Sequence, residues 1–114
     1  MFSTEKCRRA DMAIRDTLDV VGGKWKLILI AVLRDGPMRF NQLSNEVGIT
    51  PRILSKELEE LQMNGLVDRK VKNTKPITVE YSLTPYCSTL NDVLIAMEEW
   101  GVSHRMHVVN DEFG

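Results

Sequence analysis

The chain has 114 residues, of which 43% are hydrophobic and 27% are charged, a composition typical of one globular domain rather than of a disordered chain. The chain has fifteen basic and sixteen acidic side chains, so the net charge of −1 predicts no general attraction to polyanions. The longest apolar run, residues 27–33, is much shorter than the about 20 residues of a membrane span, and two cysteines are too few for a disulfide framework. We therefore expect a cytoplasmic protein with reduced thiols and no membrane partner.

Two helices are predicted in the first third of the chain. Residues 1–10 are polar and are expected to form a flexible arm. From residue 11 onward apolar side chains recur at helical spacing until the glycine pair 22–23 ends the helix. A second helix is predicted over residues 24–35, because a Gly-Pro pair follows it.

The middle of the chain has the pattern of a helix-turn-helix. A short helix over residues 39–47 ends at Gly48, and a second helix over residues 50–64 begins with Thr50 and Pro51. Threonine is a good N-cap, and proline fits the first helical position because it has no N–H group to leave unpaired there.

A β-hairpin and a long helix are predicted after the helix-turn-helix. Side chains alternate between apolar and polar over residues 67–83, with turn-forming residues at 73–76, which indicates a hairpin with one apolar face. The last helix is expected over residues 85–106. This order predicts an α+β, mainly α fold: a winged helix-turn-helix domain over residues 11–107, with extra N- and C-terminal helices and a tail over 108–114.

The helix over residues 50–64 is predicted to present a polar face to solvent. Leucines at 54, 58 and 61 share one side of the helical wheel and are expected in the core. Arg52, Ser55 and Lys56 lie on the opposite side, and the remainder of that side is acidic: Glu57, Glu59 and Glu60. Arginine and serine can bond to base edges in the major groove, which favours a recognition helix. The alternative is an ordinary amphipathic helix with a solvated polar face.

The hairpin carries a local run of positive charge. The run comprises Arg69, Lys70, Lys72 and Lys75, with no acidic residue inside it. Beside a helix-turn-helix, such a projection is expected to neutralise DNA phosphates and so to position the protein. Considered alone, a charge run is more often a solvated face.

Four motifs resemble the HxlR-type winged helix-turn-helix regulators, relatives of the MarR group. The resemblance covers residues 18–104 and implies a bacterial, cytoplasmic, homodimeric transcriptional regulator that binds double-stranded operator DNA. By position it implies that Arg39 touches the DNA backbone and that Lys72 and Lys75 lie on the wing. It further implies that Thr50, Pro51, Arg52, Ser55 and Lys56 enter the major groove. The motifs are LDVVGGKW at 18–25, GPMRFNQL at 36–43, ITPRILS at 49–55 and VEYSLTP at 79–85.

Both terminal helices carry apolar stripes that the helix-turn-helix and hairpin do not need, so we expect a two-fold dimer. Such a dimer would set two recognition helices about 34 Å apart to read an inverted repeat. The alternative is that the terminal helices fold back on their own core. The predicted interface residues are Ile14, Leu18, Leu90, Leu94, Met97 and Trp100.

Cys7 is a candidate redox sensor. Some HxlR-type regulators sense electrophiles or oxidants through a cysteine ten residues before the glycine pair, a position held here by Met12; Cys7 lies five residues further upstream. Basic neighbours, Lys6, Arg8 and Arg9, are typical of reactive cysteines. The alternative is an exposed, unreactive thiol, and Cys87 is expected to be buried.

We expect neither an enzyme nor a metal or cofactor site. His104 and His107 share a helix face but lack further ligands, and no nucleophile motif or phosphate-binding glycine loop occurs. The leading hypothesis is therefore a regulator with an unidentified effector. Two alternatives are a winged-helix module that binds protein instead of DNA, and a thiol-based enzyme.

Overall fold

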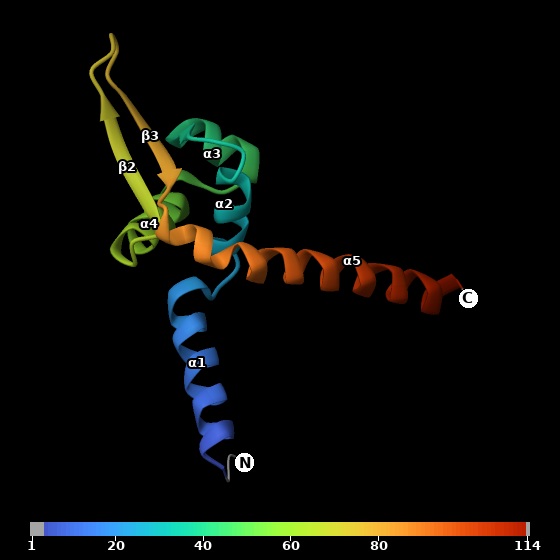
Figure 1. The fold of residues 1–114 in the computed structure, drawn as a ribbon. Coiled ribbons are helices and arrows are strands. Elements are labelled where there is room, and N and C mark those ends of the chain that lie inside the picture. The colour runs from blue at the N-terminus through green and yellow to red at the C-terminus, as the bar shows by residue number, and fades with distance from the viewer. Residues whose placement is uncertain (1–3, 114) are drawn as a thin grey trace.

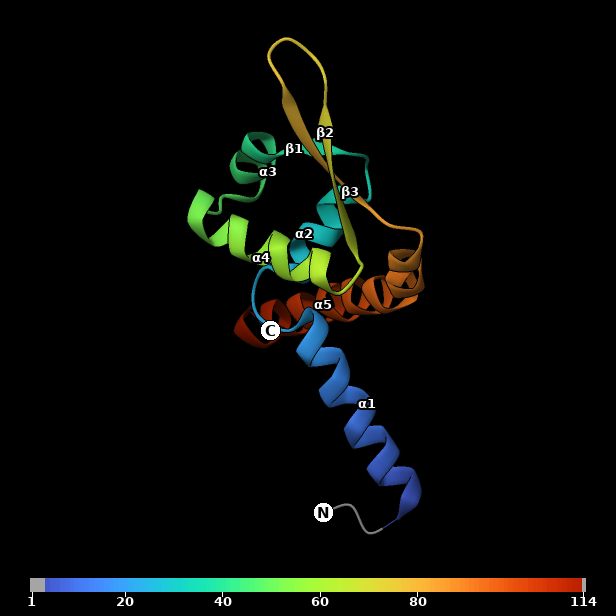
Figure 2. The same ribbon diagram turned by 90° about the vertical axis from the view of Figure 1, so that its left-hand side faces the viewer.

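The structure, a computed structural model, describes residues 4–113 (Figure 1). A small domain of three helices and a three-stranded sheet lies between two long terminal helices, which point in different directions (Figures 1 and 2). The elements are α1 (Glu5–Val21), α2 (Lys26–Leu33), β1 (Met38–Arg39), α3 (Phe40–Val47), α4 (Pro51–Met63), β2 (Val67–Lys72), β3 (Thr78–Leu83), the 3-10 helix η1 (Tyr86–Leu90) and α5 (Asn91–Phe113). The predicted winged helix-turn-helix fold is thus confirmed.

Helix α1 begins earlier than predicted. The Thr4 side chain accepts a hydrogen bond from the backbone N–H of Cys7 at 3.2 Å, so residues 5–10 are helical and not a flexible arm. Residues 1–3 of the expected arm lie outside the described residues. The helix ends as predicted at Gly22, where a Cβ atom would lie 2.3 Å from the Leu18 carbonyl oxygen, so only glycine fits.

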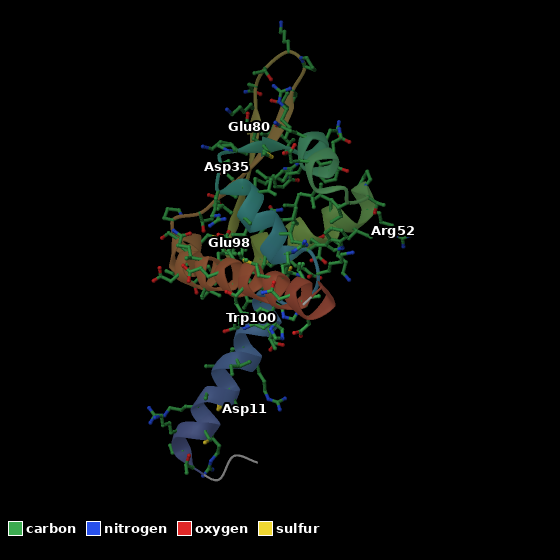
Figure 3. All side chains as sticks on the ribbon, turned by 90° about the vertical axis from the view of Figure 1, so that its right-hand side faces the viewer. Asp11, Asp35, Arg52, Glu80, Glu98 and Trp100 are labelled. Atoms are coloured by element: carbon green, nitrogen blue, oxygen red, sulfur yellow. The ribbon has the colours of Figure 1, made fainter. Side chains whose placement is uncertain are left out.

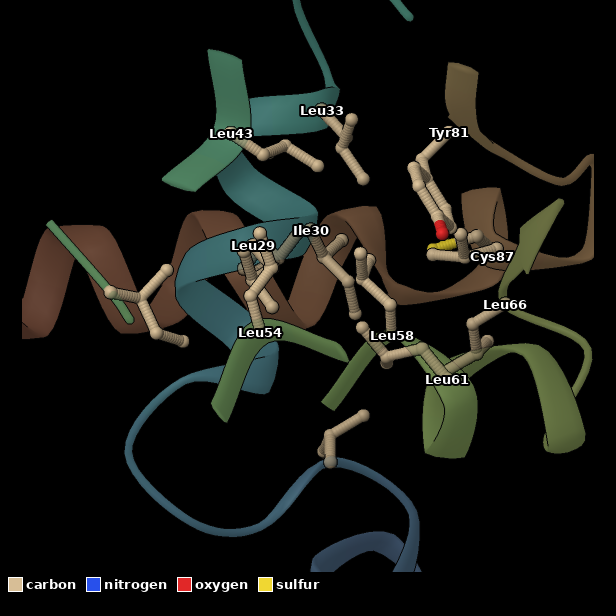
Figure 4. Packing of buried hydrophobic residues seen from close by; sticks show 14 residues of the cluster. Leu29, Ile30, Leu33, Leu43, Leu54, Leu58, Leu61, Leu66, Tyr81 and Cys87 are labelled. Atoms are coloured by element: carbon tan, nitrogen blue, oxygen red, sulfur yellow. The ribbon is translucent and has the colours of Figure 1, made fainter. Parts of the chain in front are cut away.

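The core of the domain forms around α2. Leu29 and Ile30 are completely buried and pack against leucines from α3 and α4, including Leu43 and Leu54 (Figure 4). Burial of each such side chain contributes about 1.5–3 kcal/mol. Tyr81 and Cys87 close the core on the side of the sheet and η1. The three leucines of α4 that the wheel assigned to the core, 54, 58 and 61, are all buried as predicted.

The turn of the helix-turn-helix depends on Gly48. Its φ of 75° is left-handed, which glycine adopts without strain, and its N–H donates to the Ser44 carbonyl at 2.9 Å. The Ser44 hydroxyl donates to the carbonyl of Ile49 at 2.6 Å. Thr50 then caps α4 as predicted, since its side chain accepts from the N–H of Ile53 at 3.4 Å, with Pro51 in the first turn.

The predicted hairpin is present, with an additional short strand that the sequence did not reveal. The sheet order is β1-β3-β2, all antiparallel, and β1 places Arg39 opposite Glu80. The expectation of one apolar face is confirmed only at the base of the hairpin. Val67 is buried there, whereas Val71 and Ile77 are exposed because the hairpin extends beyond the core.

The C-terminal region differs from the prediction at both ends. The chain turns first through the 3-10 helix η1, and α5 then continues past residue 106, so residues 108–113 are helical and not a tail. Residues 107–113 contain neither glycine nor proline, and His107 pairs with Asp111 one turn later at 3.1 Å. Within residues 4–113, none of the helices is both long enough and apolar enough to span a membrane.

Candidate nucleic-acid interface

The outer face of α4 is polar and exposed. Arg52, Ser55 and Lys56 are exposed, while the opposite side of the helix is buried in the core. The Arg52 side chain extends away from the domain (Figure 3). A guanidinium, a hydroxyl and an ammonium therefore occupy the first two turns of a helix held from behind, where they can reach a flat or grooved polar surface.

Arg39 lies where α3 meets the hairpin. It is exposed and precedes the first turn of α3, and its strand pairs with β3. A shallow cavity of about 340 Å³ lies here between the first turn of α3 and the start of β3, with Arg39 and Asn41 on one side and Ile77 and Thr78 on the other. The hairpin and α3 lie at the end of the domain away from α1 (Figure 2).

The four cations of the hairpin are all exposed, but they are not equivalent. Lys72 pairs with Glu80 of the neighbouring strand, with 3.2 Å between Nζ and Oε1. Lys75 lies in the turn beyond the strands, at the end farthest from the core. Lys72 and Lys75 are the two lysines predicted to lie on the wing. Lys72 has a carboxylate partner within the hairpin, whereas Lys75 forms no ion pair among the described side chains.

Two of the three acidic residues of α4 do not lie where the sequence predicted. Glu57 and Glu60 turn toward α2, where both accept hydrogen bonds from the ammonium of Lys26; the Nζ–Oε2 distance to Glu57 is 2.5 Å. Only Glu59 remains an exposed carboxylate without this partner. The expectation that Glu57 and Glu60 extend the outward face is wrong, because a buried amine attracts them inward.

Lys26, the buried amine behind α4, was not among the residues predicted from the sequence. Burial lowers the pKa of Lys26, but the hydrogen bonds and charges of Glu57 and Glu60 outweigh this, so its pKa lies above the usual value. The hydrogen bond from Lys26 lowers the pKa of Glu60. The available signal was a single charge at the start of an otherwise apolar helix, KLILIAVL, which requires a partner when buried.

The predicted dimer surface divides into two groups of residues. Ile14 and Leu18 on α1, and Met97 and Trp100 on α5, are exposed in the single chain; Trp100 is 68% exposed and stacks on His104. The second group is already covered by the chain's own core: Leu94 is only 4% exposed, and Leu90 is partly buried against the core. The assignment of Leu94 to an interface is therefore corrected, since it packs within its own chain.

The two cysteines occupy contrasting environments. Cys7 is exposed on α1, as expected. Cys87 is buried as predicted, and burial raises the pKa of its thiol above the usual value, which favours the protonated form. No group of three or more metal-binding side chains lies together in the part of the chain that the structure describes.

Comparison with known proteins places this geometry among regulators. Residues 20–109 match the family described as HxlR-like helix-turn-helix. The HTH-type transcriptional regulator YybR of Bacillus subtilis is 47% identical over 78% of this chain and 72% of its own. The reduced form of the redox regulator HypR is 42% identical, with a TM-score of 0.79 over 86% of this chain and 98% of its own. A MarR-family regulator from Enterococcus faecalis is 34% identical, with a TM-score of 0.75 over 96% of this chain and 97% of its own.

Proposed function

This chain belongs to the HxlR-like helix-turn-helix family of transcriptional regulators, and from that membership we propose that it is a cytoplasmic homodimer that binds an inverted-repeat operator. Helix α4 enters the major groove of double-stranded DNA, and the hairpin from Val67 to Leu83 acts as the wing on the adjacent backbone. The observation that carries the proposal is the exposed face of Arg52, Ser55 and Lys56 on a helix whose other side is fixed in the core.

The proposed contacts have two roles. Arg52 and Ser55 read base edges, because a guanidinium can bond bidentately to guanine and a hydroxyl to several bases. Lys56 and the wing cation Lys75 bind phosphates and fix the position of the protein without reading sequence. Arg39 binds the backbone where α3 meets the wing, and the first turn of α4 at Thr50 and Pro51 lies against the groove.

The proposed dimer is supported by the apolar side chains that remain exposed on the two terminal helices. Ile14 and Leu18 on α1, together with Met97 and Trp100 on α5, expose large apolar surfaces that a second copy would cover. A shallow groove along α5, lined by Val93, Ala96, Met97 and Trp100, is almost entirely apolar. A dimer with two-fold symmetry would present two copies of α4 to one face of DNA.

The direct test is selection of bound fragments from the DNA of the source organism, followed by footprinting. The proposal predicts a protected inverted repeat with half-site centres about one helical turn apart, occupied by two chains per site. Sedimentation of the complex measures this stoichiometry. Recovery of no protected sequence, combined with retention of a protein partner, would favour a winged-helix module that binds protein.

We also propose that any thiol-dependent response of this regulator resides in Cys7 and not in Cys87. Cys7 is exposed, while Cys87 is buried in the core. The similarity to a protein described as a redox regulator supports an oxidant as the signal. The test is DNA binding with and without diamide: Cys7→Ser is expected to abolish any effect of the oxidant, and an effect that survives in Cys7→Ser would contradict the assignment.

A further inference from the structure

The recognition helix carries more negative than positive charge, which is unfavourable for binding DNA. A carboxylate next to a DNA-facing cation pairs with that cation and repels phosphate, and both effects reduce the number of counterions that binding releases. The negative side chains of α4 are Glu57, Glu59 and Glu60, and the positive ones are Arg52 and Lys56.

One buried lysine from another helix holds two of these three carboxylates. Lys26, at the start of α2, is 7% exposed, and its Nζ lies 2.5 Å from Oε2 of Glu57 and in direct contact with Oε2 of Glu60. Lys26 is the one charged residue in the α2 sequence, and more than 30 residues separate it from both carboxylates. The three side chains form a connection between α2 and the inner flank of α4.

Glu60 lies between two amines. On its inner side it contacts Lys26, and on its outer side Lys56 precedes it by four residues, the spacing at which side chains meet on a helix. The charge of Lys56 does act on the Glu60 carboxyl group, though less than the hydrogen bond from Lys26 does. The side chain of Glu60 is 38% exposed, so it has room to move outward if Lys26 is absent.

We propose that Lys26 is a positioning residue for DNA binding: it holds Glu57 and Glu60 against α2 and thereby leaves the Lys56 ammonium available to a DNA phosphate. This inference rests on the proposed DNA-binding function. Without Lys26, the Glu60 carboxylate turns outward and pairs with Lys56. Lys56 then no longer displaces a counterion from DNA, although α4 itself remains folded.

The test uses variants matched in charge. Lys26→Met combined with Glu57→Gln keeps the net charge of the wild type and leaves no unpaired carboxylate at the half-buried position 57. We expect this double variant to bind DNA more weakly, with a slope of log affinity against log salt that is smaller by about one per protomer. Adding Glu60→Gln is expected to restore the slope, because glutamine carries no charge to neutralise Lys56.

The matched control adds Glu59→Gln to the same double variant. It has the same net charge as the variant with Glu60→Gln, but Glu59 does not contact Lys26. The slope is expected to stay reduced in this control. Equal restoration by both substitutions would show that the effect is not specific to Glu60 and would overturn the proposal, as would a double variant that retains the wild-type slope.

A second measurement needs no DNA. Carbon NMR of the side-chain carboxyl group gives the titration midpoint of Glu60 in the wild type and in Lys56→Gln. In the otherwise wild-type chain we expect Lys56→Gln to change the Glu60 midpoint only slightly, because Lys26 holds the carboxylate. In the double variant we expect Lys56→Gln to change this midpoint more. A large shift in the otherwise wild-type chain would contradict the proposal. If the wild type shows no salt-dependent DNA binding, the proposed function fails, and this measurement still decides the role of Lys26.

Discussion

Lys72 of β2 and Glu80 of β3 form an ion pair across the wing, with the ammonium nitrogen 3.2 Å from the carboxylate oxygen. Glu80 lies near the middle of β3, where it is also the residue opposite Arg39 of β1. A lysine that already has a carboxylate partner releases less counterion on binding DNA than one without. The two wing lysines selected from the sequence are therefore expected to differ in their contributions.

Lys75→Ala is expected to weaken binding to all DNA sequences about equally and to lower the salt slope by about one per protomer. Lys72→Ala is expected to lower the slope by clearly less, because Glu80 compensates its charge in the free protein. Fluorescence anisotropy over a range of salt concentrations measures both slopes. Equal losses for the two variants would show that the Lys72–Glu80 pair opens on DNA.

Arg52→Ala is expected to cost about 1–3 kcal/mol on the operator and to relax its specificity at one base position. The reason is that a bidentate contact to guanine cannot be replaced by a methyl group. The measurement is affinity for the operator and for a scrambled fragment of the same length. An unchanged ratio of the two affinities would show that Arg52 does not contact the bases of the operator.

Trp100 and Leu94 lie six residues apart on α5, and we expect substitutions at these two positions to have different effects. Trp100→Glu places a charge in the proposed dimer surface and should give a folded monomer, because Trp100 contributes little to the core of its own chain. Leu94→Ala instead creates a cavity in that core and should lower stability by about 2–5 kcal/mol. Sedimentation reports the first effect and chemical unfolding the second. A Trp100→Glu chain that still sediments as a dimer would contradict the proposed surface.

The contacts of Glu60 with Lys26 predict that acid destabilises the protein. The pKa of Glu60 is lowered in the folded state, so its contribution to stability is present above the usual value of 4.5 and is lost as the pH falls through the folded-state pKa. The pKa of Lys26 is raised, so its contribution is present below its usual value of 10.5 and is lost as the pH rises through the folded-state pKa. Unfolding curves between pH 3 and pH 7 check the first statement. A Glu60→Gln chain should lose less stability over this range than the wild type, and an identical pH dependence would contradict this.

Local signals in the sequence predicted most of the elements correctly. Leucines at helical spacing identified the inner side of α4, Thr50 and Pro51 its beginning, and Gly48 the preceding turn. These features depend on a few neighbouring residues, so no tertiary information is needed to interpret them. The same is true of the hairpin, whose alternation and turn residues are contiguous.

The errors concern features that depend on distant partners or on the competition between weak signals. The two-residue strand β1 exists only because β3 pairs with it. Glu57 and Glu60 turn inward because Lys26, from a helix more than 30 residues away, is buried beside them. Helix α1 begins before the predicted residue 11, because the cap at Thr4 outweighs the polar composition of residues 5–10. Leu94 packs against its own core, and an apolar stripe alone does not show which of its residues do so.

The proposed DNA binding uses the exposed cations of α4 and the wing. The most direct test is its affinity for the DNA upstream of its own gene and for unrelated DNA, measured by fluorescence anisotropy as salt is raised. We expect tighter binding to a specific site, and a steep linear fall of log affinity with log salt on both fragments. Weak binding that does not change with salt on any DNA would contradict it.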